Sequence, residues 1–187
     1  MIYESLSCLA EEMNIFFRSK LKITEDKVIV SAIVSQDGSV AIQGENKVVI
    51  SLVNMMKDTT VKREVSAGAS VTGSGPRPIC LQLSVLISCY FTANNYAESL
   101  RFLSFVISFL QTKNVFDHSN TPQLDDAIDK LVFEMESYEP DRLNNIWAIL
   151  GAKYMPSVLY RTRMVVLDAS VVREYRPAVT GISSSAM

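Results

Sequence analysis

Histidine and cysteine, which supply many metal ligands and catalytic nucleophiles, are scarce in this chain: its 187 residues include one histidine and three cysteines. No sequence signature gives His118 the nucleophile and the orienting partner that a catalytic histidine needs, so we expect an exposed loop residue. Cys8, Cys80 and Cys89 lack a metal-ligand spacing and suit a reducing compartment, where thiols stay unpaired. The sequence therefore predicts buried free thiols, with no metal and no cofactor.

Long apolar runs are also missing. The most apolar stretches, residues 79–91 and 102–110, fall short of the about 20 residues that a helix needs to cross a bilayer. The chain has no basic start, and Glu4, Glu11 and Glu12 interrupt any apolar signal region. We therefore predict a protein without a membrane span, made and kept in the cytoplasm unless a particle carries it elsewhere.

A surplus of positive charge is absent as well. Lys and Arg number 18 against 20 Asp and Glu, which gives a net charge of −2. Proteins that bind nucleic acid usually present a basic face that displaces counterions from the phosphates. The basic residues here are scattered, and the nearest to clusters are Lys62-Arg63 and the pair Arg161 and Arg163. We therefore expect no nucleic-acid partner.

Apolar residues, by contrast, are plentiful. They make up 48% of the sequence, against 20% charged residues, and the mean hydropathy is +0.17. A chain of this length buries roughly 70% of the surface that it exposes when unfolded, so one domain needs no metal or disulfide to fold. The hydropathy is high for such a domain and predicts either a large core or apolar surface kept for neighbouring subunits.

Two segments depart from this composition. Residues 66–78 are rich in Gly, Ser and Pro without an apolar repeat, and they predict a mobile arm within the domain. After Arg176-Pro177 the chain becomes Ser-rich, so residues 176–187 are predicted to form a disordered tail. The domain itself is predicted to span residues 1–175.

Apolar periodicity predicts three helices, over residues 3–22, 95–111 and 140–150. The second helix begins at Asn95 with Glu98 three residues later, as in a capping box. It carries apolar side chains on two sides, which is typical of a helix that lies between layers or against another subunit.

Five strands are predicted, over residues 28–34, 47–56, 79–91, 131–137 and 157–167. In the third strand, the odd positions are apolar whereas the even positions include Gln82, Ser84 and Ser88. We therefore expect the face with the even positions to be more exposed to solvent. Consecutive strands are joined too tightly for parallel crossovers. We infer an α+β domain with a mostly antiparallel sheet and helices packed on one face.

Two short motifs resemble phosphate or metal sites. Residues 68–74 have the glycine spacing of a phosphate loop, but Ser74 stands where the lysine of such a loop belongs. Asp125-Asp126-Ala-Ile-Asp129 has the spacing of a magnesium-diphosphate motif of prenyl-transferring enzymes, which are all-helical and carry a second acidic motif. We interpret these acids as the first turn of a short helix after Thr121-Pro122. With no nucleophile signature either, the sequence predicts no catalytic residue and no enzyme.

Four separated segments resemble one family when they are taken in order along the chain. They are residues 45–54, 95–100, 120–122 and 143–160, the last reading LNNIWAILGAKYMPSVLY. Together they are similar to the N-terminal domain of the cap, or tail-terminator, protein of phage-tail-like contractile injection systems. The resemblance covers nearly the whole of residues 1–168.

The resemblance implies a tail-terminator-like fold and a structural function. Proteins of this family form a hexameric ring that ends the inner tube and the sheath distal to the baseplate and links the two. The partners expected from it are further copies of the chain, sheath and inner-tube proteins, and a second cap paralogue, because many members carry a further C-terminal region. The particle would assemble in the cytoplasm and be released or anchored.

Alternative functions stay open at this point. Within the same particle, the chain could be a tail-completion protein or a chaperone that holds sheath or tube subunits before assembly. A different class is a small cytosolic enzyme that uses the Gly-rich loop.

The predicted partner contacts are basic or aromatic. Tyr154 and Tyr160 lie in the longest segment of resemblance, although a packed corner between helix and strand also explains them. Arg161 and Arg163 share one strand face, which is either solvated or in contact with an acidic tube or sheath surface. The other candidates lie in or near the arm and the tail: Lys62, Arg63, Arg77, Tyr175 and Arg176.

Overall fold

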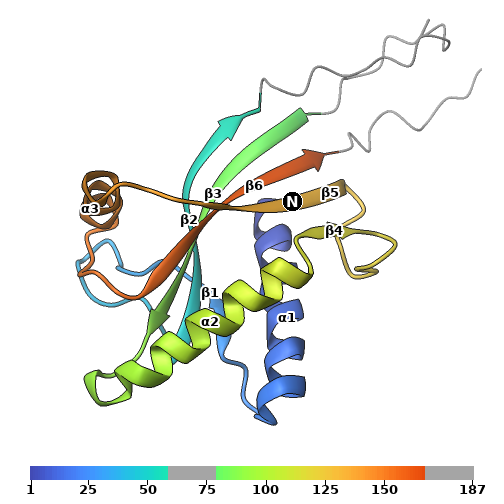
Figure 1. Cartoon of the computed structure of the whole chain (residues 1–187). Helices are drawn as coiled ribbons and strands as arrows, with labels where there is room; N and C mark the ends of the chain where they lie inside the picture. Colours follow the sequence, from blue (N-terminus) through green and yellow to red (C-terminus); the bar gives the residue numbers. More distant parts are fainter. Residues whose placement is uncertain (59–78, 167–187) are drawn as a thin grey trace, which may run out of the picture.

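A six-stranded sheet with the strand order β1-β2-β3-β6-β5-β4 is the centre of the computed structural model, which describes residues 1–58 and 79–166 (Figure 1). Two longer helices cover one face of the sheet, and a short one packs on the other. The predicted α+β class with a mostly antiparallel sheet is confirmed. In chain order the elements are α1 (Ile2–Leu21), β1 (Val28–Val30), β2 (Lys47–Lys57), β3 (Ile79–Tyr90), η1 (Ala93–Asn95), α2 (Tyr96–Thr112), β4 (Val115–Asp117), β5 (Ile128–Glu136), α3 (Pro140–Ile149) and β6 (Ser157–Val166).

Strand β3 lies in the middle of the sheet and is paired on both sides along nearly its whole length. It runs antiparallel to β2 and to β6, with Ile87 opposite Ile50 on one side and opposite Val158 on the other. Neighbouring side chains of a strand point to opposite faces. Val85 and Ile87 therefore enter one core, whereas Leu86 enters another.

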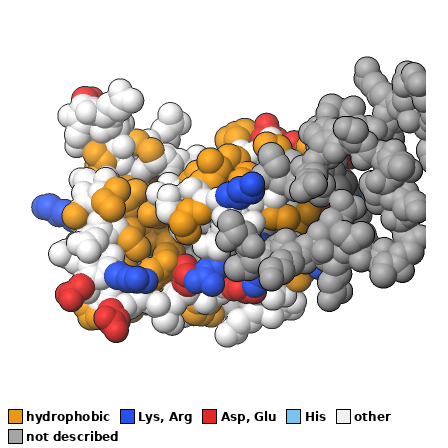
Figure 2. Space-filling view, turned by 90° about the horizontal axis from the view of Figure 1, so that it is seen from above, with side chains coloured by type: hydrophobic (Ala, Val, Ile, Leu, Met, Phe, Trp, Pro, Cys, Tyr) orange, Lys and Arg blue, Asp and Glu red, His pale blue; other side chains and the backbone are white. Residues whose placement is uncertain are grey.

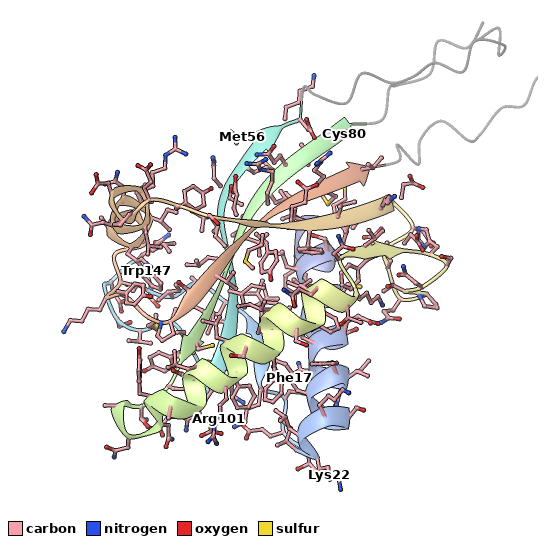
Figure 3. All side chains as sticks on the ribbon, in the orientation of Figure 1. Phe17, Lys22, Met56, Cys80, Arg101 and Trp147 are labelled. Atoms are coloured by element: carbon pink, nitrogen blue, oxygen red, sulfur yellow. The ribbon has the colours of Figure 1, made fainter. Side chains whose placement is uncertain are left out.

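The larger core fills the space between the sheet and helices α1 and α2. Phe17 of α1 and Val106 of α2 are both fully buried in it. The ring of Phe17 packs edge-on against Phe102, with 5.4 Å between the ring centroids. Figure 3 shows Phe17 where the two helices meet. The apolar spacing of these two helices correctly indicates the side that each one buries.

The short helix α3 packs on the opposite face, which differs from the expectation that all helices share one face. Trp147 is 4% exposed and closes a second core with Leu86 and Leu159. Ser84 and Ser88 are buried on this side, so the even positions of β3 do not form a wetter face. The alternation along a strand tells which residues share a face, but it does not tell whether another element covers that face.

The first strand pairs parallel to β2, which corrects the inference that the early strands are joined too tightly for a parallel crossover. Strand β1 has three residues, and residues 31–46 connect it to β2. This connection exceeds the dozen or so residues that a parallel pair requires. Within it, Val34 bridges to Val40 around a turn at Gly38, whose φ is +83°. The predicted strand 28–34 therefore ends early, at Val30.

Three local features also differ from the sequence predictions. Asn95 forms no side-chain cap on α2, and its Nδ2 donates to Asn46 Oδ1 at 3.2 Å. Residues 122–127 form turns in place of a short helix, and Asp125 Oδ1 accepts a hydrogen bond from the Ala127 amide at 2.8 Å. Strand β4 was not predicted, since its three residues are too few to show an apolar period.

The buried side chain of Asn14 joins α1 to β1 and generates the first prediction. Its Nδ2 donates to Val28 O at 2.9 Å, and its Oδ1 accepts from the amides of Lys27 at 3.0 Å and Val28 at 2.9 Å. Asn14→Ala leaves these backbone groups without partners, so we expect the free energy of unfolding in urea to fall by about 2–4 kcal/mol. Asn145→Ala, at an exposed position of α3, is the control and should change it by less than about 0.5 kcal/mol. Equal unfolding midpoints for the two variants would contradict this role of Asn14.

Burial also separates the three free thiols by reactivity. Burial raises the pKa of Cys89 to about 12 and that of Cys8 to about 11, whereas Cys80 is only partly buried. Because the thiolate is the reactive form, a thiol reagent at mildly alkaline pH should modify Cys80 alone in the folded chain. All three cysteines should react in denaturant. A fast reaction that persists in Cys80→Ser would show that the assignment of Cys8 and Cys89 to the core is wrong.

Candidate partner-binding surfaces

The two arginines predicted as contacts project from β6 as members of a ladder of charges, and their side chains are 40% and 43% exposed. Arg161 pairs with Glu136 of β5, and Arg163 pairs with Glu134 at 2.6 Å. The hydroxyl of Tyr138 donates to Glu136 at 2.6 Å, and Glu134 raises the pKa of Arg163. These contacts balance the arginine charges within the chain, so a partner would meet paired charges here rather than a free basic patch.

The two candidate tyrosines lie in different environments. Tyr154 is 63% exposed, and its ring meets that of Trp147 with 5.7 Å between the centroids. Tyr160 is 3% exposed within the larger core, and burial raises its pKa to about 12. The packed interpretation therefore accounts for Tyr160, whose side chain offers no surface to a partner, while Tyr154 remains accessible.

The remaining candidates lie outside the described residues: Lys62, Arg63, Arg77, Tyr175 and Arg176. The same holds for the predicted arm, the predicted tail and the glycine motif of residues 68–74.

A hollow of about 400 Å³ opens beside α3. We call it the α3 hollow; it is lined chiefly by Leu143, Asn144, Trp147, Ala148, Ala152 and Tyr154, and none of the described residues that line it is charged. The indole Nε1 of Trp147 is buried and has no hydrogen-bond acceptor in the part of the chain that the structure describes. A concave surface without charge suits an apolar segment of another protein.

Strand β2 has an open outer edge over its second half. Because β1 pairs only with residues 48–50, residues 52–57 have β3 on one side and no other described strand on the other side. The Asp58 amide donates to Cys80 O at 2.9 Å, and residues that bond across an antiparallel pair alternate with residues that do not. Met55 and Lys57 therefore turn their backbone N–H and C=O groups toward the open edge.

A second hollow, of about 510 Å³, meets this edge at Leu52, and its walls come from both faces of the sheet. Tyr3 and Leu6 of α1 line it, as do Ile149 and Leu150 at the end of α3, with Leu52 and residues 30–34 among the other lining residues. Tyr3 is 68% and Ile149 is 77% exposed, and no lining residue is charged. We call the open edge of residues 52–57, together with this hollow, the β2 slot.

Apolar and charged side chains lie close together on the end of the molecule that Figure 2 shows from above. Hydrophobic side chains gather over the part of this face that is not grey, and Lys or Arg side chains alternate with Asp or Glu along one margin. Figure 3 shows Met56 and Cys80 near the ends of β2 and β3 at this end of the sheet. An extended apolar segment laid along β2 would find backbone partners and apolar walls together.

Sequence patterns did not reveal the β2 slot or the α3 hollow, because both depend on where neighbouring elements end. One signal was present in the sequence, namely the adjacent large apolar residues Met55 and Met56 at the end of residues 47–56. The pairing register shifts between Leu52 and Asn54, which makes Val53 a bulge. After it, Met55 and Met56 are both 47% exposed, an unusual position for two large apolar side chains.

The residues first considered for chemistry occupy ordinary positions. His118 is exposed in the turn after β4, and the acidic motif of residues 125–129 lies in turns and at the start of β5. Among the described residues, no group of three or more His, Cys, Asp or Glu could hold a metal ion. The described helices include none with the length and apolar character to cross a membrane.

The fold is similar to two solved structures. The first is the sheath/tube terminator of PVC, an extracellular contractile injection system, in its extended state, with a TM-score of 0.59 and 16% identity over 97% of this chain. The second is the tube-terminating cap of the anti-feeding prophage, AFP, with a TM-score of 0.57 and 16% identity over 95% of this chain. The chain spans 63% and 60% of the length of these two proteins. No curated protein matches the sequence.

The family comparison covers nearly the whole sequence. A model of the Pvc16 N-terminal domain matches residues 7–181 and so includes all four segments on which the resemblance was based. The resemblance is confirmed: the chain belongs to the Pvc16 N-terminal domain family.

Proposed function

We propose that this chain is a cap, or terminator, of an extracellular contractile injection system, and that it ends the inner tube and the sheath distal to the baseplate. The observation that carries the proposal is the family match over residues 7–181, together with a fold that aligns over 97% of the chain with a sheath/tube terminator. A cap acts through shape and contacts. Its function is therefore structural and requires neither a catalytic residue nor a cofactor.

The proposed cap is a ring of six copies around the tube axis, which stops polymerisation and links sheath to tube. The family resemblance supports the ring, and the apolar residues left exposed support extensive contacts with neighbours; they include Tyr3, Tyr96, Leu100 and Ile149. The similar terminators are longer than this chain. The family resemblance also suggests a second cap paralogue as a partner.

The β2 slot provides the proposed contact with the sheath. An extended segment of a sheath subunit would pair with the outward backbone groups of Met55 and Lys57. Where the segment continued along the edge to Leu52, its alternate side chains would face the walls formed by Tyr3 and by Ile149. The paired sheath segment would then be unavailable to a further sheath subunit. The pairing would therefore end the polymer.

The composition of the open edge agrees with such a contact. Proteins commonly protect exposed sheet edges with charges, prolines or bulges. Residues 52–57 include one charged residue, Lys57, and no proline, and Met55 and Met56 are exposed. The bulge at Val53 lies near the start of this edge, before Met55 and Lys57. An edge of this kind suits a strand that is covered in the assembled particle.

Particle length tests the proposed function. If the gene is deleted, growth of the tube and sheath loses its stop, so electron microscopy should show overlong or ragged particles. Adding the gene back should restore the normal length distribution. Particles of normal length with a closed distal end would overturn the terminator function. Absence of the chain from purified wild-type particles would favour the assembly chaperone instead.

Met55→Pro tests the β2 slot itself. The Met55 amide faces the open edge, so proline there should keep the pairing of β2 with β3 while removing a donor and blocking an added strand. In the deletion background, this variant is expected to leave particles overlong. Met55→Ala is the matched control, because it shortens the same side chain and keeps the amide, and it should restore normal length.

Circular dichroism and thermal unfolding of both variants check that the fold is kept. If folded Met55→Pro caps particles as well as Met55→Ala does, the sheath does not pair with this edge.

A further inference from the structure

Helix α2 carries an apolar stripe along its outer surface. Its sequence has no charged residue between Phe102 and Thr112. Tyr96 and Leu100 are 57% and 43% exposed, and Leu103 and Ile107 are partly buried. These four residues are spaced by four, three and four positions and therefore form one apolar stripe, the α2 ridge. Of the other exposed positions of α2, Ala97, Ser104, Ser108 and Gln111 are uncharged, and the charged residues Glu98 and Arg101 lie in its first two turns.

The adjacent helix α1 gives an internal comparison, because it packs on the same face of the same sheet. Its exposed positions include Glu4, Glu11, Arg18 and Lys20, as expected for a helix in contact with water. Its exposed large apolar side chains are Tyr3 and Ile15, at 68% and 52%; they are twelve positions apart and form no stripe. Helix α2, unlike α1, therefore presents a continuous apolar stripe, which suits a surface that another protein covers.

The α3 hollow has the complementary shape and lies on the opposite face of the sheet. Helix α2 packs on the face that Val85 enters, and Trp147 of α3 packs on the face that Leu86 enters. The ridge is convex, the hollow is concave, and neither contains a charged residue. Two unlike surfaces on opposite faces of one subunit permit a head-to-tail contact, in which each copy uses its ridge on one neighbour and its hollow on the other.

We propose that the α2 ridge of one copy packs into the α3 hollow of the next copy, and that this contact joins neighbouring subunits. The α2 ridge then acts as an amphipathic helix in a groove, with Leu100 and Ile107 as anchors and Trp147 and Tyr154 as part of the opposing wall. The inference rests on the proposed ring and assigns its lateral contact. The α3 hollow and the β2 slot have no lining residue in common.

Two variants of the full chain test the two surfaces separately. Leu100→Asp places a charge on the ridge, and Ala148→Asp places one in the hollow; both positions are exposed, so the fold should be kept. Sedimentation velocity and native mass spectrometry should show that the dissociation constant for self-association rises at least about thirtyfold in each variant relative to the wild type. Ile15→Asp is the matched control on α1 and should associate like the wild type.

Mixing the two variants distinguishes a head-to-tail contact from other arrangements. Leu100→Asp keeps an intact hollow and Ala148→Asp keeps an intact ridge, so an equimolar mixture should form a heterodimer that neither variant forms alone. Self-association of Ala148→Asp without that of Leu100→Asp would indicate that ridge packs on ridge, and it would overturn the proposal. A wild type that stays monomeric, or variants that associate normally, would overturn it too.

The outcome is separable from that of the proposed function. Overlong particles after gene deletion combined with normal association of Leu100→Asp would reject the ridge contact and leave the terminator standing. Normal particle length combined with the predicted heterodimer would reject the terminator and leave the contact between copies standing.

Discussion

The alternation of side chains along β3 is the constraint on which the rest of the structure depends. This central strand pairs with β2 and β6 and sends Val85 and Ile87 to one core and Leu86 to the other. Both faces of the sheet must therefore be covered, because each buried apolar side chain contributes about 1.5–3 kcal/mol only if water is excluded from it. Helices α1 and α2 cover one face and α3 covers the other (Figure 1). This division places the α2 ridge and the α3 hollow on opposite sides of the subunit.

The two edge strands of the sheet, β1 and β4, cover their neighbours to different extents, and this difference links the fold to the function. At one end, β4 closes the sheet beside β5. At the other end, β1 is fixed by Asn14 but ends after three residues, which leaves residues 52–57 of β2 open. A subunit with a lateral ridge, a lateral hollow and an open edge has separate surfaces for its own copies and for another protein. A cap that joins a ring to a sheath requires both kinds of surface.

Sequence patterns predicted the parts of the fold that repeat with a helical or strand period. The helices around Phe17 and Phe102 and the long strand through Ile87 were predicted for this reason, and the family was indicated by four ordered segments. Features that depend on contacts between distant residues were not predicted. The parallel pairing of β1, the placement of Trp147 on the second face and the burial of Ser88 all arise from such contacts. The open edge was missed because it is set by the end of β1 at Val30, which no local pattern marks.

The central claim is that this fold closes the distal end of the particle with its β2 edge covered. Electron cryomicroscopy of that end, with the purified wild-type particle, tests it most directly. The account predicts a ring of this chain at the last layer of sheath and tube, and a strand from a sheath subunit paired beside residues 52–57. A distal end closed by a different protein, or a ring of this chain whose β2 edge faces solvent, would contradict it.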